Sequence, residues 1–247
     1  MLSKYSHYVA ILAIAAVCEI SASTLFLADV RGQMFEPPAG NPTPTTSIGG
    51  GRRGNDGECL RNRGMKTGAP ASQSPEHPLT PLLPPNKFGL TISPYPQFFA
   101  YIPKTSAIAV EFTLENQQGK GIAQKRIALT STPSIVSFQF QETPLEVGKD
   151  YKWLVSLVCE TGDPEDVFAE GIVRRITPES TLTKKLATVS VTEQVHLLAK
   201  SGVWYDAIAG LVNLQLSQPN SADLKTSWQN LLKSTSLENL ANAPLQK

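Results

Sequence analysis

The sequence predicts an α+β fold in which an antiparallel, immunoglobulin-like β-sandwich at residues 79–177 is followed by a C-terminal helical cap at residues 178–247. Short runs of alternating apolar residues fill the first region, and turns with Gly or Pro separate them. This arrangement is typical of antiparallel sandwiches. In the second region apolar residues recur at the spacing of an amphipathic helix.

The strand region is expected to begin with an edge strand at 79–83, because an edge tolerates proline. Alternation over 108–114 and 122–129, joined by the turn Gln118–Gly121, predicts a hairpin. Further alternating runs, which bring the total to about six or seven strands, lie at 136–140, 151–159 and 167–176. We expect Trp153 to be the central core residue.

The helical region contains three apolar faces, separated by Gly202 and by Pro219. These faces consist of Val195, Leu198 and Ala199; of Ala207, Ile208, Leu211, Val212 and Leu214; and of Leu224, Trp228, Leu231 and Leu232. Asn220 or Ser221 is available as the N-cap of the third helix. The spacing from Ala207 to Pro219 resembles the second half of a tetratricopeptide repeat. One such unit cannot build a solenoid groove, so an ordinary helical cap is the alternative.

The N-terminus has the three parts of a secretory signal peptide. Lys4 supplies a positive charge, Tyr8–Val17 is apolar, and Ser21–Ser23 offers small residues for cleavage. The apolar stretch is shorter than the roughly 20 residues that span a bilayer. We therefore expect residues 1–22 to be removed, which leaves a periplasmic or extracellular protein without a membrane span. An uncleaved anchor is the alternative.

Residues 23–78 are expected to form a mostly irregular linker, because they are rich in Pro and Gly. The whole chain has 22 basic and 21 acidic residues, a net charge of +1. This balance argues against nucleic acid as a partner, since a phosphate backbone selects a basic face.

Cys59 and Cys159 remain after signal cleavage, and an exported chain meets an oxidising environment. They are expected to form a disulfide, which would close a loop of about 100 residues and stabilise the fold by roughly 4 to 5 kcal/mol on the chain-entropy model. The alternative is two buried or free thiols.

Catalytic and metal-binding patterns are weak. His77 in a loop and His196 on a helix lack the spacing to Cys, Asp or Glu that a metal site or a triad needs. Gly49–Gly54 satisfies G-x-G-x-x-G, but proline precedes it and Asn55–Gly57 follows, where a dinucleotide site needs a strand and a helix. We expect no enzyme activity, no cofactor and no metal.

Charged residues gather at two places in and before the last strand run. Asp163, Glu165 and Asp166 share one loop and form either a solvated acidic turn or a set of oxygen ligands for calcium. Glu170 and Arg174 lie four residues apart on one strand face. A structural role is expected for that pair whether the face is buried or exposed.

Five blocks of sequence resemble the cyanobacterial family known as domain of unknown function 928. These blocks are Gly89–Pro96, Phe98–Pro103, Pro144–Trp153, Phe168–Arg175 and Gly202–Ala207. The likeness runs from about Gly49 to the C-terminus. It implies an exported protein, indicates no reaction, and implies two cysteines where this chain has Cys59 and Cys159. Arg52 departs from the family, which usually has a small hydroxyl residue in its Gly/Arg motif.

The function expected from these features is a non-catalytic interaction module that binds another protein of the cell envelope. Four aromatic residues are candidates for the contact: Phe99, Tyr101, Trp204 and Tyr205. Burial between the sandwich and the helices is the alternative for each. A polysaccharide-binding sandwich is the second hypothesis, in which exposed aromatics stack on sugars. A hydrolase that uses carboxylates such as Glu111 and Glu170 is the third.

Overall fold

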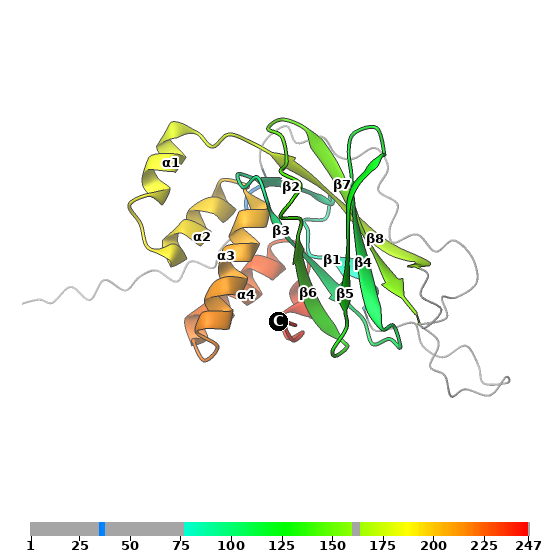
Figure 1. The fold of residues 1–247 in the computed structure, drawn as a ribbon. Coiled ribbons are helices and arrows are strands. Elements are labelled where there is room, and N and C mark those ends of the chain that lie inside the picture. Colours follow the sequence, from blue (N-terminus) through cyan, green and yellow to red (C-terminus); the bar gives the residue numbers. More distant parts are fainter. Residues whose placement is uncertain (1–34, 38–76, 160–163, 247) are drawn as a thin grey trace, which may run out of the picture. The chain divides into compact units, whose positions relative to one another are not determined.

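A computed structural model describes residues 35–37, 77–159 and 164–246, which belong to a unit that spans residues 31–247 (Figure 1). These residues form an α+β fold with eight strands in two sheets, followed by four helices. The α+β prediction is therefore confirmed. The predicted signal peptide, most of the predicted linker and Cys59 lie outside the described residues.

The larger sheet has five strands in the order β2-β8-β7-β4-β5. Its members are β2 (Phe88–Thr91), β4 (Ala109–Glu115), β5 (Gly121–Ala128), β7 (Asp150–Val158) and β8 (Pro164–Arg175). The predicted hairpin is β4 and β5, which pair in an antiparallel manner. Gly119 in the connecting turn has a φ of 72°, a conformation that glycine adopts without strain.

The smaller sheet has three strands in the order β1-β3-β6. They are β1 (Thr80–Pro81), β3 (Gln97–Ile102) and β6 (Ser134–Gln139), and both pairings are antiparallel. The short strand β1 is the predicted edge strand.

The prediction of wholly antiparallel sheets is wrong at one edge, where β2 pairs with β8 in parallel. The chain leaves β2 for β3 of the other sheet instead of turning back in a hairpin, so β2 takes its partner, β8, from the far end of the strand region. An ideal Cβ on Gly89 would lie 2.7 Å from the ring of Tyr205, so the side chain of a helix residue takes the space beside this strand.

Aromatic residues fill the space between the sheets. Phe98 of β3 stacks on Phe138 of β6 with ring centroids 4.9 Å apart, and Phe138 stacks on Phe112 of β4. Trp153 of β7 is fully buried, with its ring 5.5 Å from Phe98 and 5.6 Å from Phe138. The prediction that Trp153 is a central core residue is confirmed.

Four helices follow the sheets: α1 (Ser180–Leu186), α2 (Val191–Lys200), α3 (Trp204–Ser217) and α4 (Ala222–Lys233). A 3₁₀ turn (Glu238–Leu240) lies near the C-terminus. The side chain of Ser221 accepts a hydrogen bond from the Leu224 amide, so Ser221 is the N-cap of α4, as one of the two alternatives predicted. Helix α1 was not predicted, because it buries no residue and shows no apolar face.

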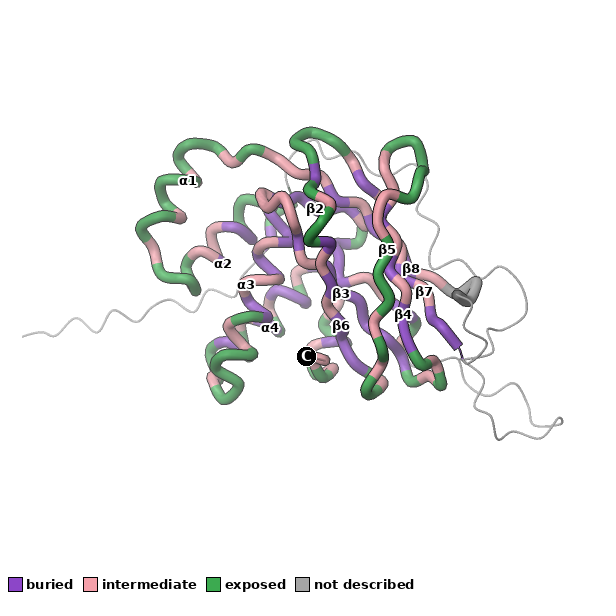
Figure 2. The backbone as a smooth tube through the Cα atoms, viewed as in Figure 1, coloured by how far each residue is buried: buried purple, intermediate pink, exposed green. Residues whose placement is uncertain are grey.

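The predicted apolar faces of α2, α3 and α4 are buried, apart from the half-buried Leu214. Figure 2 shows these faces in contrast to the exposed α1. No helix among the described residues is both long and apolar enough to cross a membrane.

Candidate functional site

The start of α3 forms the centre of the junction between helices and sheets. The Tyr205 hydroxyl accepts a hydrogen bond from the Trp153 indole N–H at 2.7 Å and donates to the Ile172 carbonyl at 3.1 Å. Trp204 donates its indole N–H to the Leu82 carbonyl at 2.8 Å. Burial raises the pKa of the Tyr205 hydroxyl well above its ordinary value, so the hydroxyl remains a donor.

The four aromatic contact candidates are all buried. Phe99, Tyr101, Trp204 and Tyr205 have exposed fractions of 2%, 7%, 0% and 1%. The prediction that they form an exposed contact surface is therefore wrong, and the alternative, burial, holds for each of them. Strand β3 is buried on both faces because one face meets the five-stranded sheet and helix α3 packs against the strand as well.

Phe35 extends this junction from a remote part of the chain. Its ring lies edge-on to Trp204 with centroids 5.0 Å apart, and its amide donates to the Ser234 hydroxyl at 3.3 Å. The residues just before the proline-rich tract are thereby attached to the helices.

Asp206 holds the segment that follows β2, a role that sequence analysis missed. Its carboxylate accepts hydrogen bonds from the Thr91 hydroxyl at 2.7 Å and from the Ile92 amide at 3.1 Å. Burial raises the pKa of the Asp206 carboxyl, while these hydrogen bonds act in the opposite direction. An acidic residue in the first turn of a helix was the available signal, but it did not identify Thr91 as the partner.

This shift predicts a pH dependence of stability. The folded state holds the Asp206 proton more tightly than the unfolded chain, so stability is greatest below the ordinary pKa of 3.8 and falls as pH rises through the raised value. Relative to Asp206→Asn, the wild type should lose free energy of unfolding from about pH 4 upward until the carboxyl is fully ionised. Urea denaturation at a series of pH values measures this difference. A difference that stays constant from about pH 3 to pH 8 would contradict the prediction.

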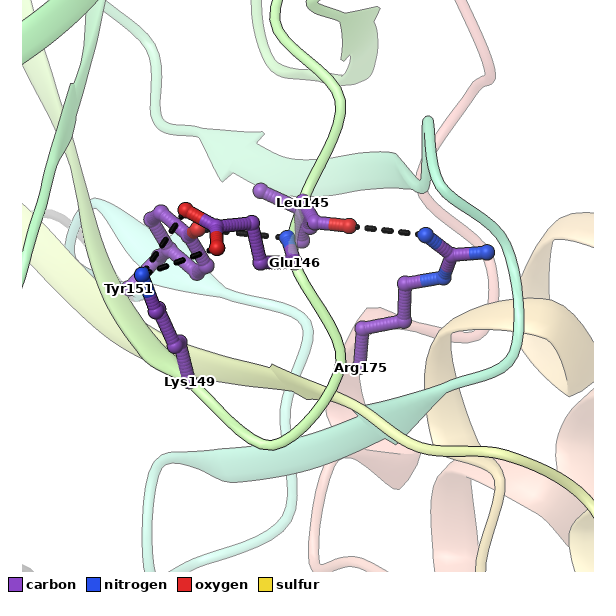
Figure 3. Close-up of polar contacts among 5 residues, drawn as sticks. All are labelled: Leu145, Glu146, Lys149, Tyr151 and Arg175. Carbon is purple, nitrogen blue, oxygen red and sulfur yellow. Dashed lines mark hydrogen bonds and ion pairs between the residues drawn. The ribbon is translucent and has the colours of Figure 1, made fainter.

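A second polar cluster joins the loop before β7 to the end of β8 (Figure 3). Arg175 donates to the Leu145 carbonyl at 2.9 Å, and the Tyr151 hydroxyl accepts a hydrogen bond from the Glu146 amide at 3.2 Å. The Glu146 carboxylate pairs with Lys149, and this interaction raises the pKa of the lysine. The contacts are local and fix the loop, so we assign this cluster a structural role.

The outer face of the five-stranded sheet contains cross-strand ion pairs. Arg126 pairs with Glu111 at 2.9 Å, Lys152 with Glu115 at 2.9 Å, and Arg174 with Asp150 at 2.5 Å. Each pair joins residues that lie directly opposite each other on adjacent strands. Like other partly exposed pairs, they are expected to contribute little individually.

Glu170 and Arg174 share this outer face, as predicted, but Arg174 pairs with Asp150, which lies directly opposite it on β7. The structure also does not bring Glu111 and Glu170 together. Their strands, β4 and β8, are separated by β7, which corresponds to a lateral distance of about 10 Å. Glu111 is paired with Arg126.

The other residues that the sequence singled out as possible site residues either lie apart from one another or fall outside the described residues. His77 lies edge-on to Tyr101 with ring centroids 6.1 Å apart, and His196 is half-buried on α2. In the part of the chain that the structure describes, no three His, Cys, Asp or Glu side chains are grouped so that they could hold a metal. The side chains of Asp163, Glu165 and Asp166 and the Gly49–Gly54 tract lie outside it.

Cys159 is buried and follows β7 directly, on the same face as Trp153. Because Cys59 is not among the described residues, the disulfide stays a prediction.

The sheet edges differ in how they are covered. Strand β1 has only two residues, one of which, Pro81, has no amide to donate. The edge of β6 is met by the C-terminal segment, where the Ile135 amide donates to the Pro244 carbonyl and the Gln246 amide donates to the Ile135 carbonyl, each at 2.8 Å. The N-terminal end of α3 packs against β2. Among the described residues β5 pairs only with β4, so its outer edge is open.

The backbone groups that face this open edge can be identified. Gln246 donates its side-chain amide to the Ala128 carbonyl at 3.0 Å, so the groups of Ala128 point away from β4. The N–H and C=O groups of successive residues point to opposite sides of a strand. The β4–β5 register is regular from residue 123 to 128. The N–H and C=O groups of Gln124 and Arg126 therefore also point outward. Figure 2 shows β5 as exposed or half-buried along most of its length.

The family described as Domain of Unknown Function (DUF928) matches residues 48–245. The chain belongs to this family. No curated protein matches the chain.

The five blocks that carry the likeness to the DUF928 family meet in the folded structure. Block Gly202–Ala207 supplies Tyr205 and Asp206, which contact Trp153 of a second block and Thr91 of a third. Block Phe168–Arg175 supplies the Ile172 carbonyl, and Phe98 of the remaining block lies 5.3 Å from the Tyr205 ring. The blocks thus correspond to the junction between sheets and helices, and their residues build the core.

Proposed function

We propose that this protein is a non-catalytic interaction module, exported to the cell envelope, that binds an extended segment of another protein by strand addition at β5. The observation that carries the proposal is the open outer edge of β5, an eight-residue strand, whereas the edges of β2 and β6 are covered and the edge strand β1 has only two residues. Strand addition joins a peptide to a sheet through backbone hydrogen bonds. Gln124 and Arg126 would supply two donors and two acceptors.

The edge lies on a rigid support. Strand β4, to which β5 is paired, is also paired along its full length with β7. The buried side chains Val110, Phe112 and Leu114 fix β4 in the core. A rigid strand lowers the ordering entropy that binding costs, which favours strand addition here.

The polysaccharide hypothesis depended on exposed aromatic side chains. The four aromatic candidates are buried, the Gly/Arg tract at residues 49–54 lies outside the described residues, and no observation within the described residues favours sugar binding. We therefore propose protein binding alone.

Two finer assignments of the fold are part of the same proposal. An immunoglobulin-like sandwich is supported by the antiparallel pairs of both sheets and by Trp153 between them, although the parallel strand β2 departs from it. A tetratricopeptide-like pair is supported by α3 and α4, which contact each other. One pair forms no solenoid groove, so we propose no ligand site for the helices.

The strand-addition proposal is tested by removing one outward amide. Gln124→Pro should leave the protein folded, because this amide does not bond to β4 and proline is tolerated at such edge positions. Tagged full-length protein is recovered from its native envelope fraction, and captured proteins are quantified by mass spectrometry. A partner held by the wild type should be recovered at least about tenfold less with Gln124→Pro, since one hydrogen bond and close approach are lost.

The matched control is Gln124→Ala, which removes the side chain but keeps the amide. It should capture the partner as the wild type does. Equal capture by wild type and Gln124→Pro, with both variants folded by circular dichroism, would contradict strand addition at β5. Absence of any captured protein would contradict the interaction-module proposal as a whole.

A further inference from the structure

The charge along the open edge identifies the class of segment that fits it. We propose that the segment bound at β5 is an acidic extended peptide; this inference rests on the proposed strand addition. Residues 117–133 contain Lys120, Lys125 and Arg126 and no acidic residue. All the charged side chains of this segment are therefore positive.

Two of these charges have no carboxylate partner among the described residues. Arg126 is paired with Glu111, but no ion pair joins Lys120 or Lys125 to a carboxylate there. The Lys125 ammonium donates only to the Gln139 carbonyl, at 3.5 Å. A strand with carboxylates opposite these cations would gain cross-strand pairs of opposite charge, while like charges would destabilise the pairing.

This charge also argues against two other occupants. A second copy of β5 has the same cations and no carboxylate, so antiparallel pairing about the centre of the strand would bring the Lys125 and Arg126 side chains of the two copies close together. The tract at residues 38–76 of this chain contains Arg52, Arg53, Arg61, Arg63 and Lys66 but only three acidic residues, Asp56, Glu58 and Glu76. Its net charge has the same sign as the edge, so a foreign acidic segment is the better match.

The C-terminal segment limits the length of the site. Besides its bond to Ala128, the side chain of Gln246 accepts a hydrogen bond from the Thr130 amide at 3.3 Å. The bound strand therefore ends before Ala128 and uses the backbone of Gln124 and Arg126. Lys125 lies between these two residues, on the opposite face of the strand, opposite the buried Phe112.

The test uses three fluorescein-labelled peptides of about eight residues, the length of a typical strand. In the first, Glu alternates with Val and Thr; in the others, Gln or Lys replaces each Glu. Fluorescence anisotropy with the full-length protein should show the Glu peptide binding about tenfold more tightly than the Gln peptide at low salt. The advantage should shrink above about 0.1 M salt, where the Debye length falls below about 10 Å.

Matched variants locate the effect. Lys125→Gln should remove most of the preference for the Glu peptide, whereas Lys184→Gln, a change on the exposed helix α1, should not alter it. Gln124→Pro should weaken binding of both the Glu and the Gln peptides. If the Gln peptide binds as tightly as the Glu peptide and Gln124→Pro weakens both, strand addition stands and the acidic class is overturned. If no peptide binds, or Gln124→Pro has no effect on the Glu peptide, the inference fails.

Discussion

Trp153→Ala is expected to destabilise the protein by about 3 to 5 kcal/mol, the range measured for removal of a buried aromatic side chain. The side chain is fully buried and contacts the rings of Phe98 and Phe138. Its indole N–H also donates to the Tyr205 hydroxyl. Because small domains have only about 5 to 15 kcal/mol of stability in total, this loss is a large fraction of it.

Urea denaturation followed by circular dichroism measures the loss. The control is Leu216→Ala on α3, whose side chain is 38% exposed, and which should change stability by less than about 0.5 kcal/mol. If the free energy of unfolding of Trp153→Ala lies within about 1 kcal/mol of the wild-type value, the assignment of Trp153 to the central core is contradicted.

Cys59→Ser is expected to lower the free energy of unfolding by roughly 4 kcal/mol, because a disulfide to Cys159 would close a loop of about 100 residues in the unfolded chain. Cys159 is buried at the end of β7, so the bond would attach the proline-rich tract to the core. Urea denaturation of the non-reduced wild type and variant measures the difference.

Reductant provides the control for this prediction. It should lower the stability of the wild type to that of Cys59→Ser and leave the variant unchanged. Two titratable thiols in the non-reduced, signal-cleaved protein would show that no disulfide forms.

Much of the strand region could be predicted because its pattern is local. Val110, Phe112 and Leu114 alternate with polar residues, and all three are buried in β4. The burial of one sheet face is enough to produce this alternation. Ser221 could likewise be proposed as an N-cap, because capping depends on residues within one helical turn.

The junction with α3 could not be predicted, because it depends on contacts between distant residues. Tyr205 follows a turn, where an exposed aromatic is reasonable, but Gly89 leaves the space that its ring occupies. Asp206 and Thr91 are 115 residues apart, and nothing in either local sequence indicates the other. Arg174 was expected to share a strand face with Glu170, as it does, but only the register across strands shows that Asp150 lies directly opposite it.

The open edge of β5 was also not predicted, because alternation identifies strands but does not show which neighbours they acquire. The order β2-β8-β7-β4-β5 places this strand at an end of its sheet. The C-terminal segment, which covers the edge of β6, leaves most of β5 uncovered.

Amide hydrogen exchange of β5, resolved by residue, tests the central claim most directly. In the free protein the Lys125 and Ile127 amides, which point toward β4, should exchange slowly, and those of Gln124 and Arg126 should exchange rapidly. Saturation with the acidic peptide should slow exchange at Gln124 and Arg126 alone within β5. Slow exchange at these two amides in the free protein, or unchanged exchange in the saturated complex, would contradict strand addition at this edge.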